Sequence, residues 1–219
     1  MRVRQICLVN GSLRGKEASS LAFLSDLGRR IRPEASRVTQ ITVPAGRQRT
    51  TPERLAAIAQ ADALVFAFPV HAYCLPGALM KLLEDYYRAV AGGLECKQNA
   101  KVYAIVNSGF PRPAVCREAV AVVRHFCRRV GLNWRFGVSI GCGPVAVMLN
   151  RVPFLNLKLK RAFSDIVSDI ELDDARDVRD YAVQPIIPER ILIAIKNRYE
   201  RRMTPRSQAD VSRVASPAS

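Results

Sequence analysis

The chain has 219 residues, a length that suits one sizeable α/β domain and leaves little room for a second. Hydrophobic residues make up 49% of it, which predicts a packed core, and charged residues interrupt every apolar run that could span a bilayer. No signal-peptide pattern is expected at the N-terminus. The net charge of +15 suits an anionic partner, either nucleic acid, anionic lipid or a phosphorylated small molecule. Because the chain carries no nucleic-acid motif, nucleic-acid binding is not expected.

The cysteines are scattered along the chain, and none forms a C-x-x-C pair. Scattered thiols are typical of a reducing compartment, so we expect free cysteines in a cytoplasmic protein. Only His71 and His125 could join them at a zinc site, and a metal site is therefore not expected.

The first strand and the loop after it organise the chain. The apolar run 6–9 is typical of a buried strand, and Asn10-Gly11 ends it as a turn pair that tolerates positive φ. Polar candidates follow in this loop and at the start of a helix predicted over 19–31: Ser12, Arg14, Ser19 and Ser20. Hydroxyls and an arginine beside the free N–H groups of a helix N-terminus can bind an anion. The stretch predicts a phosphate site, with an ordinary βα turn and an N-cap serine as the alternative.

Strands and helices alternate along the rest of the chain. Strands are predicted over about 4–9, 38–43, 63–68, 101–106 and 135–140. Helices are predicted over about 19–31, 52–61, 76–90, 114–130 and 160–172. This alternation implies an α/β fold with a doubly wound five-stranded parallel sheet. The pattern weakens after 145, where 152–159 is either a loop or a short helix.

Loops after the first, third and fourth strands hold small, turn-forming or aromatic residues. The candidates after the third strand are Pro69, Val70, His71, Ala72 and Tyr73. The candidates after the fourth strand are Asn107, Ser108, Gly109 and Phe110. In doubly wound sheets, ligands bind at the carboxyl ends of strands, at the switch point of strand order. The loops therefore predict one binding site at that edge.

Taken together, these loops resemble the flavodoxin-like superfamily, in particular its NADPH-dependent FMN reductase type. The stretch NGSLR at 10–14 is similar to the phosphate loop of that family, 63–81 to its second flavin segment, and KVYAIVNSGF at 101–110 to its third flavin loop. The resemblance covers about residues 3–165. A G-x-G-x-x-G fingerprint is absent after the first strand, which argues against a Rossmann dehydrogenase.

The resemblance implies bound FMN, NAD(P)H as co-substrate, and a flavin, quinone or other small acceptor. The cofactor would carry the chemistry, so no side chain need act as a general acid or base. The serines and Arg14 listed above would hold the FMN phosphate. Residues 69–73 would pass beside the isoalloxazine ring and ribityl chain, and 107–110 would close over the ring. A homodimer is also implied, because a neighbouring subunit often completes the flavin pocket in the family.

Two other functions stay open. One is a flavodoxin-type electron carrier, although the carriers of the family are typically acidic and this chain is basic. The other is a flavodoxin-fold interaction protein without turnover. His71 stands where the family usually has Tyr, with Tyr73 two residues on. Cys74, in the second loop, is either a redox thiol or a small apolar filler.

We expect an FMN-binding domain over 1–175, a linker and basic amphipathic helix over 176–203, and a disordered tail over 204–219. The apolar face of that helix would comprise Ile191, Leu192, Ile195 and Tyr199. This C-terminal helical extension could dock on the domain, on a partner or on an anionic membrane surface.

Overall fold

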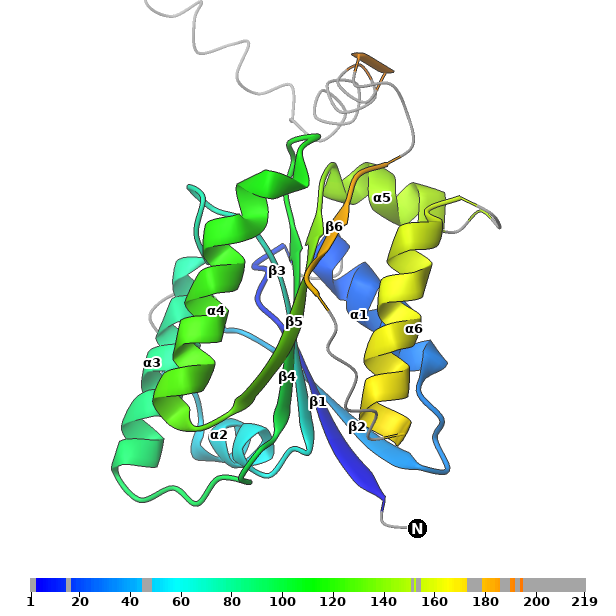
Figure 1. Cartoon of the computed structure of the whole chain (residues 1–219). Coiled ribbons are helices and arrows are strands. Elements are labelled where there is room, and N and C mark those ends of the chain that lie inside the picture. Colours follow the sequence, from blue (N-terminus) through cyan, green and yellow to red (C-terminus); the bar gives the residue numbers. More distant parts are fainter. Residues whose placement is uncertain are drawn as a thin grey trace, which may run out of the picture.

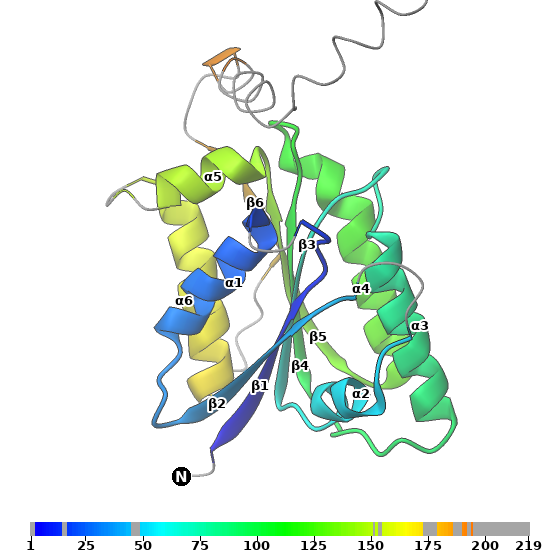
Figure 2. The ribbon, with the colours of Figure 1, turned by 180° about the vertical axis from the view of Figure 1, so that it is seen from behind.

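The computed structural model describes residues 3–14, 17–44, 49–150, 152, 155–172, 179–185, 190, 191 and 194. Most of the basic helix predicted within 176–203, and the whole tail 204–219, lie outside the described residues. A parallel sheet with helices on both faces forms the described part (Figures 1 and 2). Its strands are β1 (Arg4–Asn10), β2 (Ser36–Thr42), β3 (Ala63–Pro69), β4 (Lys101–Asn107), β5 (Asn133–Ile140) and β6 (Tyr181–Val183).

The described helices alternate with these strands. They are α1 (Ser19–Arg30), α2 (Pro52–Ala59), α3 (Gly77–Ala91), α4 (Arg117–Val130), α5 (Gly143–Asn150) and α6 (Leu157–Leu172), with a 3₁₀ turn η2 (Pro113–Cys116) before α4. The strand order is β2-β1-β3-β4-β5-β6. Chain order reverses between β1 and β3, so the switch point of the sheet lies between these two strands. The predicted doubly wound parallel sheet is confirmed, with six strands instead of five.

Central strands are apolar on both faces because helices cover both. In β3, Leu64, Phe66 and Phe68 join the core under α2, α3 and α4, whereas Val65 and Ala67 join the core under α1 and α6. The unbroken apolar run of β3 reflects this double burial. None of the described helices is long and apolar enough to span a membrane.

The sixth strand lies in a region for which the sequence predicted a linker. It has only three residues and pairs in parallel with β5. Asp180, just before it, accepts the Gly137 backbone N–H at 2.7 Å and the Arg124 guanidinium at 2.5 Å. A strand of three residues is too short to show a periodic pattern in the sequence. The carboxylate of Asp180 holds β6 in register with β5.

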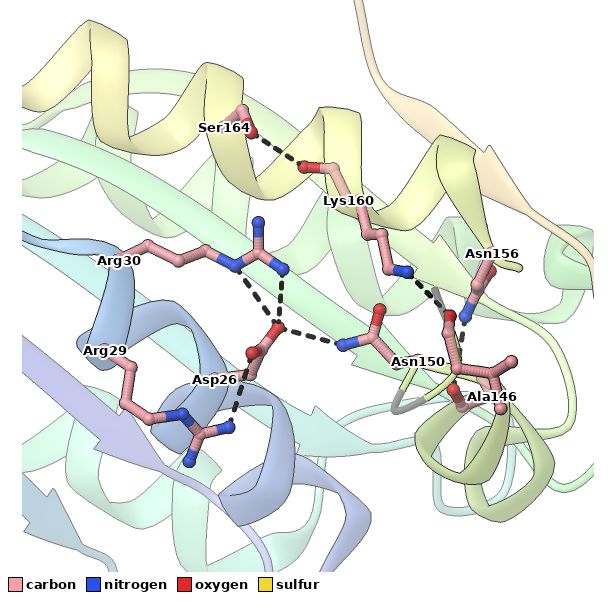
Figure 3. A network of polar contacts seen from close by, with 9 residues as sticks. Asp26, Arg29, Arg30, Ala146, Asn150, Asn156, Lys160 and Ser164 are labelled. Atoms are coloured by element: carbon pink, nitrogen blue, oxygen red, sulfur yellow. Dashed lines mark hydrogen bonds and ion pairs between the residues drawn. The ribbon is translucent and has the colours of Figure 1, made fainter. Parts of the chain in front are cut away.

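Polar contacts tie α1 to α5 and α6 to the turn before it (Figure 3). Asp26 of α1 accepts hydrogen bonds from Arg30 and from the Asn150 amide at the end of α5, the latter at 2.9 Å. The Asn156 amide donates to the Ala146 carbonyl at 3.2 Å. These bonds fix a helix, α5, that sequence periodicity does not reveal.

A buried charged cluster lies at the opposite, amino-terminal end of the strands. Asp169 of α6 accepts hydrogen bonds from the Lys101 ammonium at 2.9 Å, the Tyr103 hydroxyl at 2.8 Å and the Arg135 guanidinium at 2.6 Å. Burial, with the neighbouring Asp169 carboxylate, raises the pKa of Tyr103 far above its usual range. This cluster joins α6 to β4 and β5, away from the carboxyl edge.

Candidate functional site

Backbone hydrogen bonds bring the predicted loops together at the carboxyl edge of the sheet. The Gly11 N–H, after β1, donates to the Ala67 carbonyl in β3 at 2.8 Å. The Val70 N–H, after β3, donates to the Asn107 carbonyl at the end of β4 at 2.8 Å. The Ser108 N–H donates to the Ile140 carbonyl at the end of β5 at 2.9 Å. The loops after four neighbouring strands therefore start from one hydrogen-bonded edge, at the β1/β3 switch point.

Side chains of the β1–α1 loop organise its own backbone. The Asn10 Oδ1 accepts the Ser12 N–H at 3.1 Å, and the Ser12 Oγ accepts the Arg14 N–H at 3.3 Å. These are two successive turns of the kind that Asn and Ser favour. Asn10 and Ser12 are buried and Arg14 is exposed. The loop thus presents its arginine to solvent from a fixed backbone.

Gly11 is required by close packing and not by a turn. Among the described glycines, only Gly93 and Gly131 have positive φ, so Gly11 does not use the positive φ that a glycine tolerates. A Cβ at Gly11 would lie 2.8 Å from the Phe68 Cβ and 2.9 Å from the Leu79 Cδ2. The missing side chain lets the β1–α1 loop pass directly over β3 and α3.

Among the described residues, no side chain caps the N-terminus of α1. Its N-cap is Ala18, which makes no side-chain cap hydrogen bond, and the first turn has no acidic residue. Ser19 and Ser20 are the first residues of the helix, so neither serves as the N-cap serine of the alternative interpretation. Ser19 is half-buried and Ser20 is buried. Uncapped first-turn N–H groups carry the positive end of the helix dipole.

Asn107 connects the third loop to the first. Its Nδ2 donates to the Ser20 Oγ at 2.9 Å and to the Phe68 carbonyl at 3.1 Å. The amide is buried, and it spans the end of β4, the end of β3 and the start of α1. The sequence predicts Asn107 in the loop after the fourth strand. In the structure Asn107 is instead the last residue of β4, and its side chain points into the protein.

The β3–α3 loop forms a tight hairpin. His71 and Cys74 exchange backbone hydrogen bonds, both at 2.9 Å, and the residues between them have positive φ, 46° at Ala72 and 62° at Tyr73. Two successive positive φ values are typical of a type I′ turn, which usually contains Gly or Asn. Holding two other residues there costs free energy, roughly 1 kcal/mol or more for each. The turn places His71, Ala72 and Tyr73 in solvent beside the switch point.

The third loop is supported by the loop after β5. The Ser108 Oγ donates to the Phe110 carbonyl at 3.0 Å. The Cys142 N–H donates to that same carbonyl at 2.8 Å, and the Gly143 N–H donates to the Ser108 carbonyl at 2.8 Å. Ser108 is buried, whereas Gly109 and Phe110 are exposed. The Phe110 ring is thus held out from a rigid backbone.

The supporting loop is a part of the site that the sequence analysis did not assign. A Cβ at Gly141 would lie 2.0 Å from the Pro111 carbonyl oxygen, and one at Gly143 would lie 2.7 Å from the Asn107 Oδ1. The signal available in the sequence was the run Gly141-Cys142-Gly143-Pro144 at the end of a strand. Its two glycines allow the β5–α5 loop to touch the loop after β4.

Some of the free thiols, among them Cys74 and Cys142, lie in the loops at this edge. All the cysteines are unpaired, as expected, and Cys74 is half-buried in the second loop. Burial raises the pKa of the Cys116 thiol to about 11. That thiol is therefore protonated at neutral pH and is a packing residue. The described residues contain no group of three or more His, Cys, Asp or Glu that could hold a metal ion.

Comparison with known proteins identifies the fold. No protein-family model matches the chain, and no curated protein matches it with significance. Solved structures do match. The general stress protein 14 of Treponema denticola, solved in complex with FMN, is 15% identical with a TM-score of 0.55, and the match covers 78% of this chain and 99% of that one.

Two further matches agree with it. The Trp repressor binding protein of Bacillus subtilis is 15% identical with a TM-score of 0.52, over 74% of this chain and 96% of that one. An NADPH-quinone reductase from P. pentosaceus is 14% identical with a TM-score of 0.51, and the match covers 79% of this chain and 97% of that one. The chain has the flavodoxin-like fold that it shares with these structures, one of which was solved with FMN and another of which is named an NADPH-quinone reductase. The resemblance drawn from the sequence is confirmed at the level of the fold.

Proposed function

We propose that this protein is an FMN-dependent NAD(P)H oxidoreductase that delivers electrons to a flavin, a quinone or another small acceptor. The observation that carries the proposal is the uncapped N-terminus of α1 at the β1/β3 switch point. Doubly wound sheets bind their ligands at the switch point of strand order, and in flavodoxin the ligand at the β1/β3 switch point is FMN. The neighbour solved with FMN and the neighbour named a quinone reductase support the same assignment.

The open helix end fits the phosphate of FMN. The first-turn N–H groups of α1 and the Ser19 hydroxyl would bind phosphate oxygens, and the exposed Arg14 would supply full positive charge. Ser12 and Ser20 are buried and already accept hydrogen bonds. Each hydroxyl keeps its O–H to donate, so we propose that Ser12 and Ser20 both order the loop and the helix start and donate to phosphate oxygens.

The other two loops fit the flavin ring. Pro69, Val70 and the hairpin that follows would run along one side of the isoalloxazine ring, with Tyr73 presented for stacking. Phe110 would cover the ring from the β4 side. When bound, FMN supplies the hydride-accepting ring and the electron transfer. The residues of the chain orient that ring and shield it, and none is assigned as a proton donor.

The positive net charge would attract an anionic pyridine nucleotide. The free thiols suit a reducing compartment, and we propose a cytoplasmic protein that pairs as a homodimer. We also propose that residues 1–175 supply the flavin site, with 176–203 as an extension and 204–219 as a tail.

Loading the purified protein with FMN and adding NADPH or NADH without oxygen tests the proposal. An absorbance band near the visible flavin maximum that bleaches supports the oxidoreductase. A bound flavin that does not bleach with either nucleotide, yet accepts one electron from a chemical reductant, would replace the proposal with an electron carrier. A chain that takes up no flavin would leave an interaction protein of the same fold.

A further inference from the structure

A small apolar cluster at α5 lies apart from the two main cores. It consists of Val145 and of Cys142, just before the helix, and Leu149 packs against them. The three residues follow the i, i+3, i+7 spacing of one helix side. Ala146 and Val147, on another side, pack in the core under α1 and α6. The helix therefore has a second apolar side, which we call the outer face of α5.

The outer face is buried, although its own residues cannot cover it. Cys142 is 2% and Val145 5% exposed. Among the described residues, the apolar side chain that packs against these two is Leu149. Three side chains in a row along one helix leave the side away from the helix axis open to water. The burial is found within a single copy of the chain, so the segment that covers the face belongs to this same chain.

The chain that follows β6 starts beside the outer face (Figures 1 and 2). The Gly141 N–H, shortly before α5, donates to the Val183 carbonyl at 2.9 Å, and Pro185 is buried. The eight residues of α5 span about 12 Å. Since one extended residue spans about 3.3–3.6 Å, the residues soon after Pro185 can reach the whole face.

The sequence after Pro185 suits an apolar face without charges. Six of the ten residues 186–195 are Ile or Leu, and no charged residue occurs between Gly141 and Asn150. The described residues of this segment are helical and exposed, and they are Arg190, Ile191 and Ala194. Helical spacing from these positions predicts Leu192 and Ile195 on the opposite side of the same helix. That side is apolar and needs a surface to pack on.

We propose that residues 186–195 of this chain dock on the outer face of α5, with Leu192 and Ile195 turned toward it. Docking there supports the third loop of the candidate site from behind. The Cys142 N–H holds the Phe110 carbonyl at 2.8 Å, so a segment packed on Cys142 fixes the backbone that presents the Phe110 ring. The proposal does not depend on flavin binding.

Hydrogen–deuterium exchange of the full chain tests the docking from the side of the segment. The double variant Leu192→Gln and Ile195→Gln should speed amide exchange over 142–149 roughly tenfold, because burial of such side chains stabilises the closed form and exchange follows local opening. The control Ile191→Gln changes a neighbouring side chain that is 50% exposed, and it should leave that exchange unchanged. No change in the double variant, or an equal change in the control, would overturn the proposal.

A reciprocal pair of variants tests the docking from the side of α5. Leu149→Gln should speed exchange over 189–195 by a similar factor, and the control Met148→Gln, at a side chain that is 58% exposed, should not. Neither residue belongs to a main core, so both variants should melt like the parent. Unchanged exchange over 189–195 in Leu149→Gln would mean that the segment docks elsewhere, and would overturn the proposal. A dimer that the variant with Leu192→Gln and Ile195→Gln dissociates, measured by sedimentation, would replace it with docking on a second copy.

Discussion

The Nδ2 atom of Asn107 lies 2.9 Å from the Oγ of Ser20, and this bond joins the end of β4 to the first turn of α1. The two residues are 87 positions apart in the sequence. In the proposed site, Ser20 is in the helical turn that would bind the phosphate, and Asn107 precedes the loop that would cover the flavin ring. The bond therefore couples the placement of α1 to the placement of the third loop.

Replacing Asn107 by Ala should lower the free energy of unfolding by about 2–3 kcal/mol. The change removes two hydrogen bonds and leaves buried acceptors without a donor. Ser20→Ala removes only one of these contacts and should cost about 1 kcal/mol. Urea unfolding of both variants and of the double variant measures the coupling. Strictly additive losses would show that the two side chains do not interact.

Gly11→Ala should lower the free energy of unfolding by about 1–3 kcal/mol, because the new methyl group meets Phe68 and Leu79 at less than van der Waals distance. Gly77→Ala is the matched control. It lies in the first turn of α3, where a Cβ meets nothing within 4 Å, and it should raise stability slightly. Thermal unfolding of the two variants gives the comparison. A Gly11→Ala protein as stable as the parent would remove the packing explanation.

Asp169→Asn should destabilise the fold by about 3–5 kcal/mol, since Lys101 and Arg135 would lose a buried carboxylate. Flavin affinity should stay unchanged, because this cluster lies at the amino-terminal end of the strands. The exposed pair Glu84–Arg88 serves as the control, and Arg88→Ala should cost less than about 1 kcal/mol. Chemical denaturation measures the loss of stability, and flavin titration measures whether flavin affinity is unchanged. A parallel loss of flavin affinity in a folded Asp169→Asn protein would contradict it.

The acid stability of the protein should depend on Asp85. Partial burial raises the pKa of this carboxyl group, but the Lys81 ammonium at 2.7 Å and the Thr50 N–H at 3.0 Å outweigh it, and the net pKa is lowered. A lowered folded-state pKa contributes stability above the unfolded pKa of about 3.9, and that stability is lost as the pH falls through the folded pKa. Asp85→Asn should flatten the acid limb of a stability-against-pH curve. An identical acid limb would show that Asp85 carries no such linkage.

Apolar patterning predicted the five longer strands and most helices, because the central strands are apolar on both faces and the helices bury one regular apolar face. It missed α5, where the apolar residues of 143–150 show no single face, and β6, which has three residues and depends on Asp180. The loops of the candidate site were predicted from residue type at strand ends. What periodicity could not predict was the direction of individual side chains. Ser20 and Asn107 turn inward to each other, and the reason for Gly11 lies in residues distant in sequence.

The most direct test of the central claim is the affinity for FMN compared with riboflavin, which lacks the phosphate, measured by flavin fluorescence for the parent and for Arg14→Ala. The parent should bind FMN more tightly than riboflavin. Arg14→Ala should weaken FMN binding by about 1.5–3 kcal/mol, the range for a lost hydrogen bond to a charged group, and leave riboflavin binding unchanged. Glu17→Gln, which removes a negative charge just before α1, should tighten FMN binding. Equal affinity for the two flavins, unaffected by Arg14→Ala, would contradict a phosphate site at the N-terminus of α1.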